Sequence, residues 1–337
     1  MMKAVRTDSE LECPGIDNGL RSRGIDLVTL PDGISEDDLA AAVADADLLL
    51  MCYTPITARV IEAAPKLRGI VKYGVGIDAI DIEAAKARGI PVVNVPEYAE
   101  ETVAEGAFAM MIALAKRLPE IGRVVSEHGW IWPEQGWLGR DLAGATLGLV
   151  GVGKIGGSMA RMAGQGFRMR VLGYDPNIDG GTMRGVGVEK FDDLHAMLRQ
   201  CDFVSIHCVL NSETHHLIGA EELACLKPEA ILVNVSRGAL IDEAALVKAV
   251  VGGRLGGIAL DVFSNEPLTK TGHVMSPLFG RDDVILFPHL TFFTHEAMKR
   301  LEDDTLARCD ELIEGRPVTI RSSDPRLRTQ SKGVVFG

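Results

Sequence analysis

Short apolar runs alternate with amphipathic segments along almost the whole chain. In the first hundred residues the apolar runs fall at about 4–7, 26–30, 46–53, 69–73 and 92–95. The segments between them carry helix signals, such as Ser35 with Asp38 three residues later, the spacing of a helix N-cap. This alternation is typical of a parallel sheet with helices on both faces. We therefore predict a small doubly wound domain of five strands.

A second series of apolar runs follows a long helical segment at 102–128 and a tryptophan-rich loop. These runs fall at about 146–150, 170–174, 203–207, 231–234, 257–261 and 284–287. Six strands in series match the dinucleotide-binding Rossmann fold. The last helical segment, 294–314, has no strand of its own in this series, so we expect it to return to the first domain, followed by an extended tail.

The predicted fold class is therefore α/β, with two doubly wound parallel-sheet domains. We expect a Rossmann domain at 102–289, inserted into a flavodoxin-like substrate domain that 1–101 and 290–337 form together. A length of 337 residues agrees with two domains, because it exceeds what one ordinary core organises.

Composition narrows the classes of function. With 47% hydrophobic and 24% charged residues, the chain reads as a soluble globular protein. A net charge of -12 argues against a nucleic-acid or anionic membrane surface, since both require clustered Lys and Arg. The six cysteines lack metal-site spacing, so we expect no metal and reduced thiols. The first residues lack the apolar stretch of a secretion signal, and no apolar run approaches the roughly 20 residues of a membrane span. We expect a cytoplasmic protein.

A glycine-rich motif, Gly151-Val152-Gly153-Lys154-Ile155-Gly156, follows the run at 146–150 and opens a helix. Gly151 permits a tight turn, Gly153 lets the backbone approach a pyrophosphate, and Gly156 lets the helix pack on the strand. The helix N-terminus then attracts the phosphates.

Asp175 stands nineteen residues after Gly156, where the next strand ends. A carboxylate there accepts hydrogen bonds from the ribose hydroxyls and repels a 2'-phosphate. No Arg or Lys occurs at 176–179, so we predict NAD rather than NADP. The alternative is that Asp175 serves only as a turn residue before Pro176.

Three residues far apart in the chain suggest a hydride-transfer site. Reduction of a 2-keto acid needs a fixed cation for the carboxylate and a proton donor at the keto oxygen. Arg237 offers a planar fork that matches a carboxylate. His289 is a candidate general acid, and Glu266 is a carboxylate that would favour the protonated imidazole. Each follows an apolar strand, at the edge of a parallel sheet where ligands bind. The alternatives are an exposed loop arginine and a structural Pro-His turn.

Five motifs in order carry a resemblance to a known family. They are 73–78 (Tyr-Gly-Val-Gly-Ile-Asp), the glycine motif, 234–238 (Asn-Val-Ser-Arg-Gly), Asp261-Val262-Phe263 with Glu266-Pro267, and Pro288-His289. From about 3 to 320 the chain resembles the D-isomer-specific 2-hydroxyacid dehydrogenases. That family includes phosphoglycerate dehydrogenases, glyoxylate/hydroxypyruvate reductases and D-lactate dehydrogenases. The resemblance implies NAD-dependent interconversion of a small D-2-hydroxy acid and its 2-keto acid, by a homodimer that pairs through the long helix and the tryptophan loop.

The resemblance also implies roles for single residues. The substrate carboxylate would lie on Arg237 and on backbone N–H groups near Val75 and Gly76, with Tyr53 beside the pocket. Asp261 would lie near the nicotinamide, with Cys208 and Val209 at the adenine side. The remaining positions of the implied cofactor site are Val103, Lys154, Ile155, His207, Val235 and Ser236. We expect substrate in a cleft between the domains, which would close about hinges near 100–102 and 289–294.

The chain departs from the family after the proposed general acid. The family usually carries small residues there, whereas this chain has Leu290-Thr291-Phe292-Phe293-Thr294. This departure leaves the identity of the acid open. Two rival functions also remain: an NAD(H)-sensing, corepressor-like binding protein and a formate dehydrogenase. Formate oxidation needs no proton transfer, so an acidic partner such as Glu266 argues against the second rival.

Overall fold

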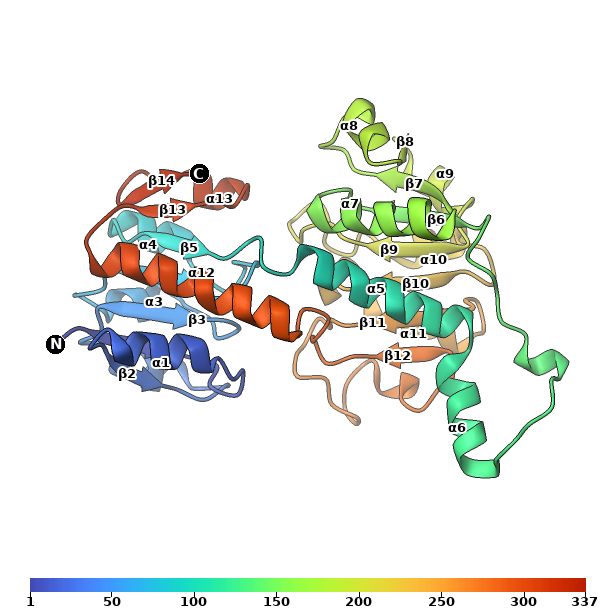
Figure 1. Cartoon of the computed structure of the whole chain (residues 1–337), viewed down its shortest axis with the longest axis horizontal. Helices are drawn as coiled ribbons and strands as arrows, with labels where there is room; N and C mark the ends of the chain where they lie inside the picture. The colour runs from blue at the N-terminus through green and yellow to red at the C-terminus, as the bar shows by residue number, and fades with distance from the viewer. The chain divides into compact units, whose positions relative to one another are not determined.

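Two parallel β-sheets organise the chain in a computed structural model that describes residues 1–337. The chain divides into unit 1, residues 1–99 and 294–337, and unit 2, residues 100–293 (Figure 1). Each unit has its own parallel sheet with helices packed on it, which confirms the predicted α/β class.

Unit 1 has a five-stranded sheet in the order β2-β1-β3-β4-β5, the order of flavodoxin-like folds. Its strands are β1 (Lys3–Arg6), β2 (Asp26–Thr29), β3 (Leu48–Met51), β4 (Gly69–Lys72) and β5 (Val92–Asn94). Its helices are α1 (Pro14–Ser22), α2 (Glu36–Ala42), α3 (Ala58–Glu62), α4 (Ile82–Ala87) and α12 (His295–Ile313). Ser35 caps α2 by accepting a hydrogen bond from the Asp38 N–H, and α12 packs on α1 and β4.

The C-terminal residues are more regular than the extended tail that we expected. They form β13 (Val318–Ile320), α13 (Pro325–Arg328) and β14 (Val334–Phe336), and β13 pairs in parallel with β14. The buried Gln330 side chain accepts from the Val92 N–H and donates to the Val92 carbonyl, both at 2.8 Å. The segment is thereby joined to the edge strand β5.

Unit 2 has a seven-stranded parallel sheet in the order β12-β11-β10-β9-β6-β7-β8. Its strands are β6 (Thr146–Val150), β7 (Arg170–Tyr174), β8 (Glu189–Phe191), β9 (Phe203–Ile206), β10 (Ile231–Asn234), β11 (Gly257–Leu260) and β12 (Val284–Leu286). The sequence predicts six of these and misses the edge strand β8. Strand order reverses between β6 and β9, which is where dinucleotides bind in Rossmann folds.

The long helix predicted at 102–128 is two helices, α5 (Glu100–Ala115) and α6 (Leu118–His128). Arg117 between them has a left-handed φ of 53°, and Pro119 occupies the first turn of α6, where proline is tolerated. The other helices are α7 (Lys154–Arg161), α8 (Gly180–Gly185), α9 (Leu194–Leu198), α10 (Ala220–Cys225) and α11 (Glu243–Val251). Two separate apolar clusters, one including α5 and α7 and the other α9, α10 and α11, bury opposite faces of the sheet. No helix has the length and apolar character that crossing a membrane requires.

Candidate active site

Three turns of unit 2 carry the residues proposed for catalysis. Arg237 follows β10, Glu266 lies in the turn after β11, and His289 follows β12. These strands are neighbours in the sheet and run parallel, so the three turns emerge at the same carboxyl edge. Arg237 and His289 are 52 residues apart in the sequence, but the sheet brings their turns to the same edge.

The turn that carries Arg237 is held by a buried side chain at the end of β10. Asn234 accepts a hydrogen bond from the Ser236 N–H at 3.0 Å and donates one to the Arg237 carbonyl at 2.9 Å. Gly238 then passes very close to the next turn, since a Cβ there would lie 2.0 Å from the Phe263 carbonyl carbon. This approach places Arg237 near enough to Glu266 for their charges to interact.

Glu266 and His289 form a hydrogen-bonded pair. His289 Nδ1 lies 2.8 Å from Glu266 Oε2, while Glu266 Oε1 accepts from the Phe263 N–H at 2.9 Å. Burial raises the pKa of the Glu266 carboxyl. The hydrogen bond and charge of His289, the Phe263 N–H and the charge of Arg237 oppose this rise, and together they bring the pKa below its ordinary value. Glu266 is therefore an ionised partner for the imidazole.

The backbone around His289 is fixed by Asp261, at the end of β11. Asp261 is fully buried and accepts hydrogen bonds from the Leu290 N–H at 2.8 Å and the Thr291 N–H at 3.1 Å. Burial raises the pKa of this carboxyl, and the hydrogen bonds from Thr291 and Leu290 oppose the rise. His289 itself has a left-handed φ of 56°, and its ring meets the buried Phe292 ring edge-on at 6.4 Å between centroids.

The glycine motif forms the turn between β6 and α7. Gly151 has a φ of 92°, and a Cβ on Gly156 would lie 2.3 Å from the Gly151 carbonyl oxygen, so both positions require glycine. A Cβ on Gly153 would meet nothing within 4 Å, which leaves room for a phosphate at the N-terminus of α7. Lys154 opens that helix and forms an ion pair with Glu100 at 3.0 Å. These features fit a dinucleotide.

Asp175, at the end of β7, accepts hydrogen bonds from the Val152 N–H at 3.0 Å and the Asn177 N–H at 2.9 Å. The carboxylate is therefore attached to the glycine turn from the neighbouring strand. Ile155, the residue before Gly156, is half-buried against the core.

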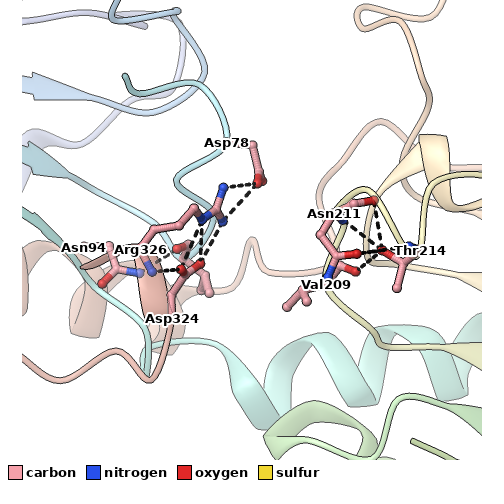
Figure 2. Close-up of polar contacts among 8 residues, drawn as sticks. Asp78, Asn94, Val209, Asn211, Thr214, Asp324 and Arg326 are labelled. Carbon is pink, nitrogen blue, oxygen red and sulfur yellow. Dashed lines mark hydrogen bonds and ion pairs between the residues drawn. The ribbon is translucent and has the colours of Figure 1, made fainter. Parts of the chain in front are cut away.

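On the other side of the strand-order reversal, β9 leads into His207, Cys208 and Val209. His207 is half-buried, its two ring nitrogens are buried without a hydrogen-bond partner, and burial lowers its pKa to about 4. Burial also raises the pKa of the Cys208 thiol to about 12, so this thiol is not a nucleophile at neutral pH. Val209 is 69% exposed, and Thr214 closes its loop by donating to the Val209 carbonyl at 2.7 Å (Figure 2).

The other predicted positions divide between the two units. In unit 2, Val235 is buried, Ser236 donates to the Ile206 carbonyl at 2.9 Å, and Val103 packs half-buried against the core. In unit 1, Val75 and Gly76 lie in the turn after β4.

Two tyrosines lie near the ends of strands β3 and β4 of unit 1, and the first of them, Tyr53, was expected beside the substrate pocket. Tyr53 is 38% exposed, and its ring lies 5.4 Å from the ammonium nitrogen of Lys72. Tyr73 is fully buried and donates to the Thr7 carbonyl. The Tyr73 side chain is therefore part of the core of unit 1.

Sequence reasoning missed the residues that hold the functional turns. Asn234, Thr291 and Asn94 were not singled out, and Asp261 was assigned to the cofactor rather than to the backbone after His289. The available signal was a polar residue closing an otherwise apolar strand, as Asn94 closes β5 and Asn234 closes β10. Both asparagines are buried.

Comparison with known proteins identifies the family. The model for the "D-isomer specific 2-hydroxyacid dehydrogenase, NAD binding domain" matches residues 108–291. A glyoxylate reductase of Korarchaeum cryptofilum is 44% identical over 264 residues, which cover 77% of this chain and 78% of that protein. A D-3-phosphoglycerate dehydrogenase of Methanocaldococcus jannaschii is 39% identical over 81% of this chain, which spans about half the length of that relative. The crystal structure of a D-lactate dehydrogenase from Aquifex aeolicus with NAD and lactic acid superposes with a TM-score of 0.82, at 28% identity, over 93% of this chain and 96% of that one.

Proposed function

The chain belongs to the D-isomer specific 2-hydroxyacid dehydrogenase family and is an NAD-dependent oxidoreductase, and from this premise we propose that it interconverts a small D-2-hydroxy acid and its 2-keto acid. The observation that carries this proposal is the 2.8 Å pair between His289 and an ionised Glu266, with Arg237 on the adjacent turn. A cation and a carboxylate-supported imidazole are the groups that keto-acid reduction requires.

Each residue has a distinct role in this proposal. Bound NAD supplies the hydride acceptor for oxidation, and NADH the hydride donor for reduction. Arg237 binds the substrate carboxylate and polarises the carbonyl. His289 uses Nδ1 for Glu266, so Nε2 is the nitrogen that donates a proton to the keto oxygen and recovers it in oxidation. Glu266 stabilises the imidazolium and fixes the orientation of its ring.

The proposed cofactor contacts lie near the point in the sheet where the strand order reverses, between β6 and β9. The N–H groups at the start of α7 bind the pyrophosphate next to Gly153, and Asp175 binds the adenosine ribose. The exposed Val209 supplies an apolar surface for the adenine. Support comes from the open space at Gly153 and from the hydrogen bond that joins Asp175 to the glycine turn.

Other cofactor residues are proposed from their positions in the turns. The neutral His207 and Cys208 belong to the adenine side with Val209. On the nicotinamide side, Asp261 acts through the backbone after His289. The remaining proposed cofactor contacts are Val103, Lys154, Ile155, Val235 and Ser236. For the substrate, the proposed contacts besides Arg237 are the amides of Val75 and Gly76 and the exposed Tyr53.

We also propose that the protein is a homodimer. The segment after α6 presents Trp130, Trp132 and Leu138 with 80%, 75% and 66% of their surface exposed. Large apolar side chains gathered in one exposed segment mark an association surface more often than a solvent-facing one.

A panel of substrates tests the reaction. The protein is assayed with NADH and glyoxylate, hydroxypyruvate or pyruvate, and separately with NAD and formate. We expect reduction of at least one keto acid and no oxidation of formate. Formate oxidation without keto-acid reduction would indicate a formate dehydrogenase. Binding of NADH with no turnover of any acid would indicate a dinucleotide-binding protein instead.

A further inference from the structure

The turn after β4 contains two consecutive peptide units whose carbonyls are both held by the end of β5. The Val95 N–H donates to the Gly74 carbonyl at 3.1 Å. The Asn94 side-chain Nδ2 donates to the Val75 carbonyl at 2.6 Å. Two hydrogen bonds from neighbouring residues therefore fix the direction of both carbonyls.

The direction of a carbonyl determines the direction of the amide that follows it. In a trans peptide unit the C=O and N–H bonds point to opposite sides. The Gly74 carbonyl shares its unit with the Val75 N–H, and the Val75 carbonyl shares its unit with the Gly76 N–H; both units are trans. Because both carbonyls face the end of β5, both N–H groups face away from it.

These two N–H groups form a pair suited to an anion. Neither the Val75 N–H nor the Gly76 N–H donates a hydrogen bond to another group of the protein. Val75 is 45% exposed, so the pair is accessible. Successive backbone N–H groups on one side of a turn make a concave donor site for a carboxylate or phosphate oxygen.

Asn94 holds the second of these units from a buried position. Its side chain is 2% exposed, and its Oδ1 has no hydrogen-bond partner, so its amide is used only as a donor to the turn. At the far end of the turn, Arg326 of α13 donates to Asp78 at 3.1 Å and is itself held by Asp324 at 2.7 Å (Figure 2). The turn is thus fastened at both ends within unit 1.

We propose that Asn94 is a positioning residue for substrate binding, whose side-chain amide turns the Gly76 N–H toward the substrate carboxylate. This inference rests on the proposed function, in which the Val75 and Gly76 amides bind that carboxylate. Asn94 does not touch the substrate in this proposal, so its loss weakens substrate binding and leaves the proton donor and the cofactor site intact.

The test compares Asn94→Asp with Asn94→Ala in the full-length protein. Asp keeps the shape of Asn but replaces the donor with an acceptor that repels the Val75 carbonyl, whereas Ala removes the donor and leaves a cavity. We expect the KM for the keto acid to rise about 10- to 100-fold in both, with Asn94→Asp at least as impaired as Asn94→Ala. The kcat and the KM for NADH should stay within about twofold of wild type.

A matched control and a second variant keep the outcome decisive. Asn18→Asp makes the same chemical change on the exposed face of α1 and should leave every constant unchanged. Arg326→Gln releases the other end of the turn from an exposed position and should raise the keto-acid KM a few-fold, even if the Asn94 variants fail to fold. A folded Asn94→Asp protein with wild-type KM, or a larger defect in Asn94→Ala than in Asn94→Asp, would overturn the inference. An inactive wild-type protein would instead refute the proposed function.

Discussion

At the scale of single residues, the site depends on one ionised carboxylate next to one imidazole. Burial alone would raise the pKa of Glu266, but His289, the Phe263 N–H and Arg237 together lower it. The carboxylate therefore stays charged at and well below neutral pH, where keto-acid reduction needs a protonated donor. A neutral side chain at position 266 would remove this stabilisation.

Glu266→Gln should reduce kcat/KM for keto-acid reduction at neutral pH by about 10- to 1000-fold, because general-acid catalysis contributes about 10²- to 10⁴-fold and part of it survives. NADH affinity should be unchanged, as measured by fluorescence titration. Glu213→Gln, an exposed site in unit 2, is the matched control. Wild-type kcat/KM in folded Glu266→Gln would show that the pair does not act in catalysis.

The lowered pKa of Glu266 also has a consequence for stability. A carboxyl with a lowered folded pKa stabilises the native state above its unfolded pKa of about 4.3, and this contribution is lost as pH falls through the folded value. The difference in unfolding free energy between wild type and Glu266→Gln should therefore be largest near pH 7 and shrink below about pH 4. Urea unfolding of the two proteins at pH 7 and below about pH 4 measures this difference in unfolding free energy. An equal difference at the two pH values would argue against a charged Glu266.

Residue patterns alone indicated Arg237, Glu266, His289 and the glycine motif, because each stands at a strand end with a recognisable chemistry. They did not indicate the residues that hold those groups in place. Asn94 and Asn234 act on backbone atoms of turns, and Asp261 acts on amides almost thirty residues away. Such contacts depend on the register of neighbouring strands, and strands that are buried on both faces read as continuous apolar runs that carry no alternation to specify it.

At the scale of elements, the contact between the turns after β10 and β11 holds Arg237 in place. Gly238→Ala would put a Cβ 2.0 Å from a backbone atom of Phe263, so the two turns would have to separate. We expect keto-acid kcat/KM to fall at least tenfold, because a displaced Arg237 needs to lose only about 1.4 kcal/mol of binding free energy for that factor. The effect on NADH binding should be smaller. Gly166→Ala, at an exposed position with open space around its Cβ and no left-handed φ, tests whether any glycine change has this effect. Equal activity of both variants would contradict the role given to this contact.

Element prediction succeeded where apolar runs are buried and failed where they are not. The central strand β6 lies where the sequence predicts it, since four of its five residues are buried. The edge strand β8 was missed because Glu189-Lys190-Phe191 is exposed or half-buried and lacks an apolar run. The break between α5 and α6 was missed because the apolar spacing continues across Arg117, although Pro119 was an available signal.

At the scale of the whole molecule, the proposed homodimer can be tested without substrate. In this proposal the two copies pair through the exposed tryptophan segment. Trp130→Glu with Trp132→Glu should convert a dimer into a monomer, because two charges would be placed on an apolar surface. Sedimentation velocity over a range of concentrations measures the change, with exposed Val251→Glu on α11 as control. A monomeric wild-type protein, or a double variant that remains a dimer, would rule out this surface.

The measurement that bears most directly on the proposed chemistry is NADH oxidation by His289→Gln in the presence of the best keto acid from the panel. Gln fills a similar volume but cannot transfer a proton as a general acid. We expect turnover to fall about 10²- to 10⁴-fold, while NADH binds as in wild type and His215→Gln, an exposed histidine of unit 2, stays fully active. If His289→Gln reduced the keto acid at close to the wild-type rate, His289 would not be the proton donor, and the proposed site would be wrong.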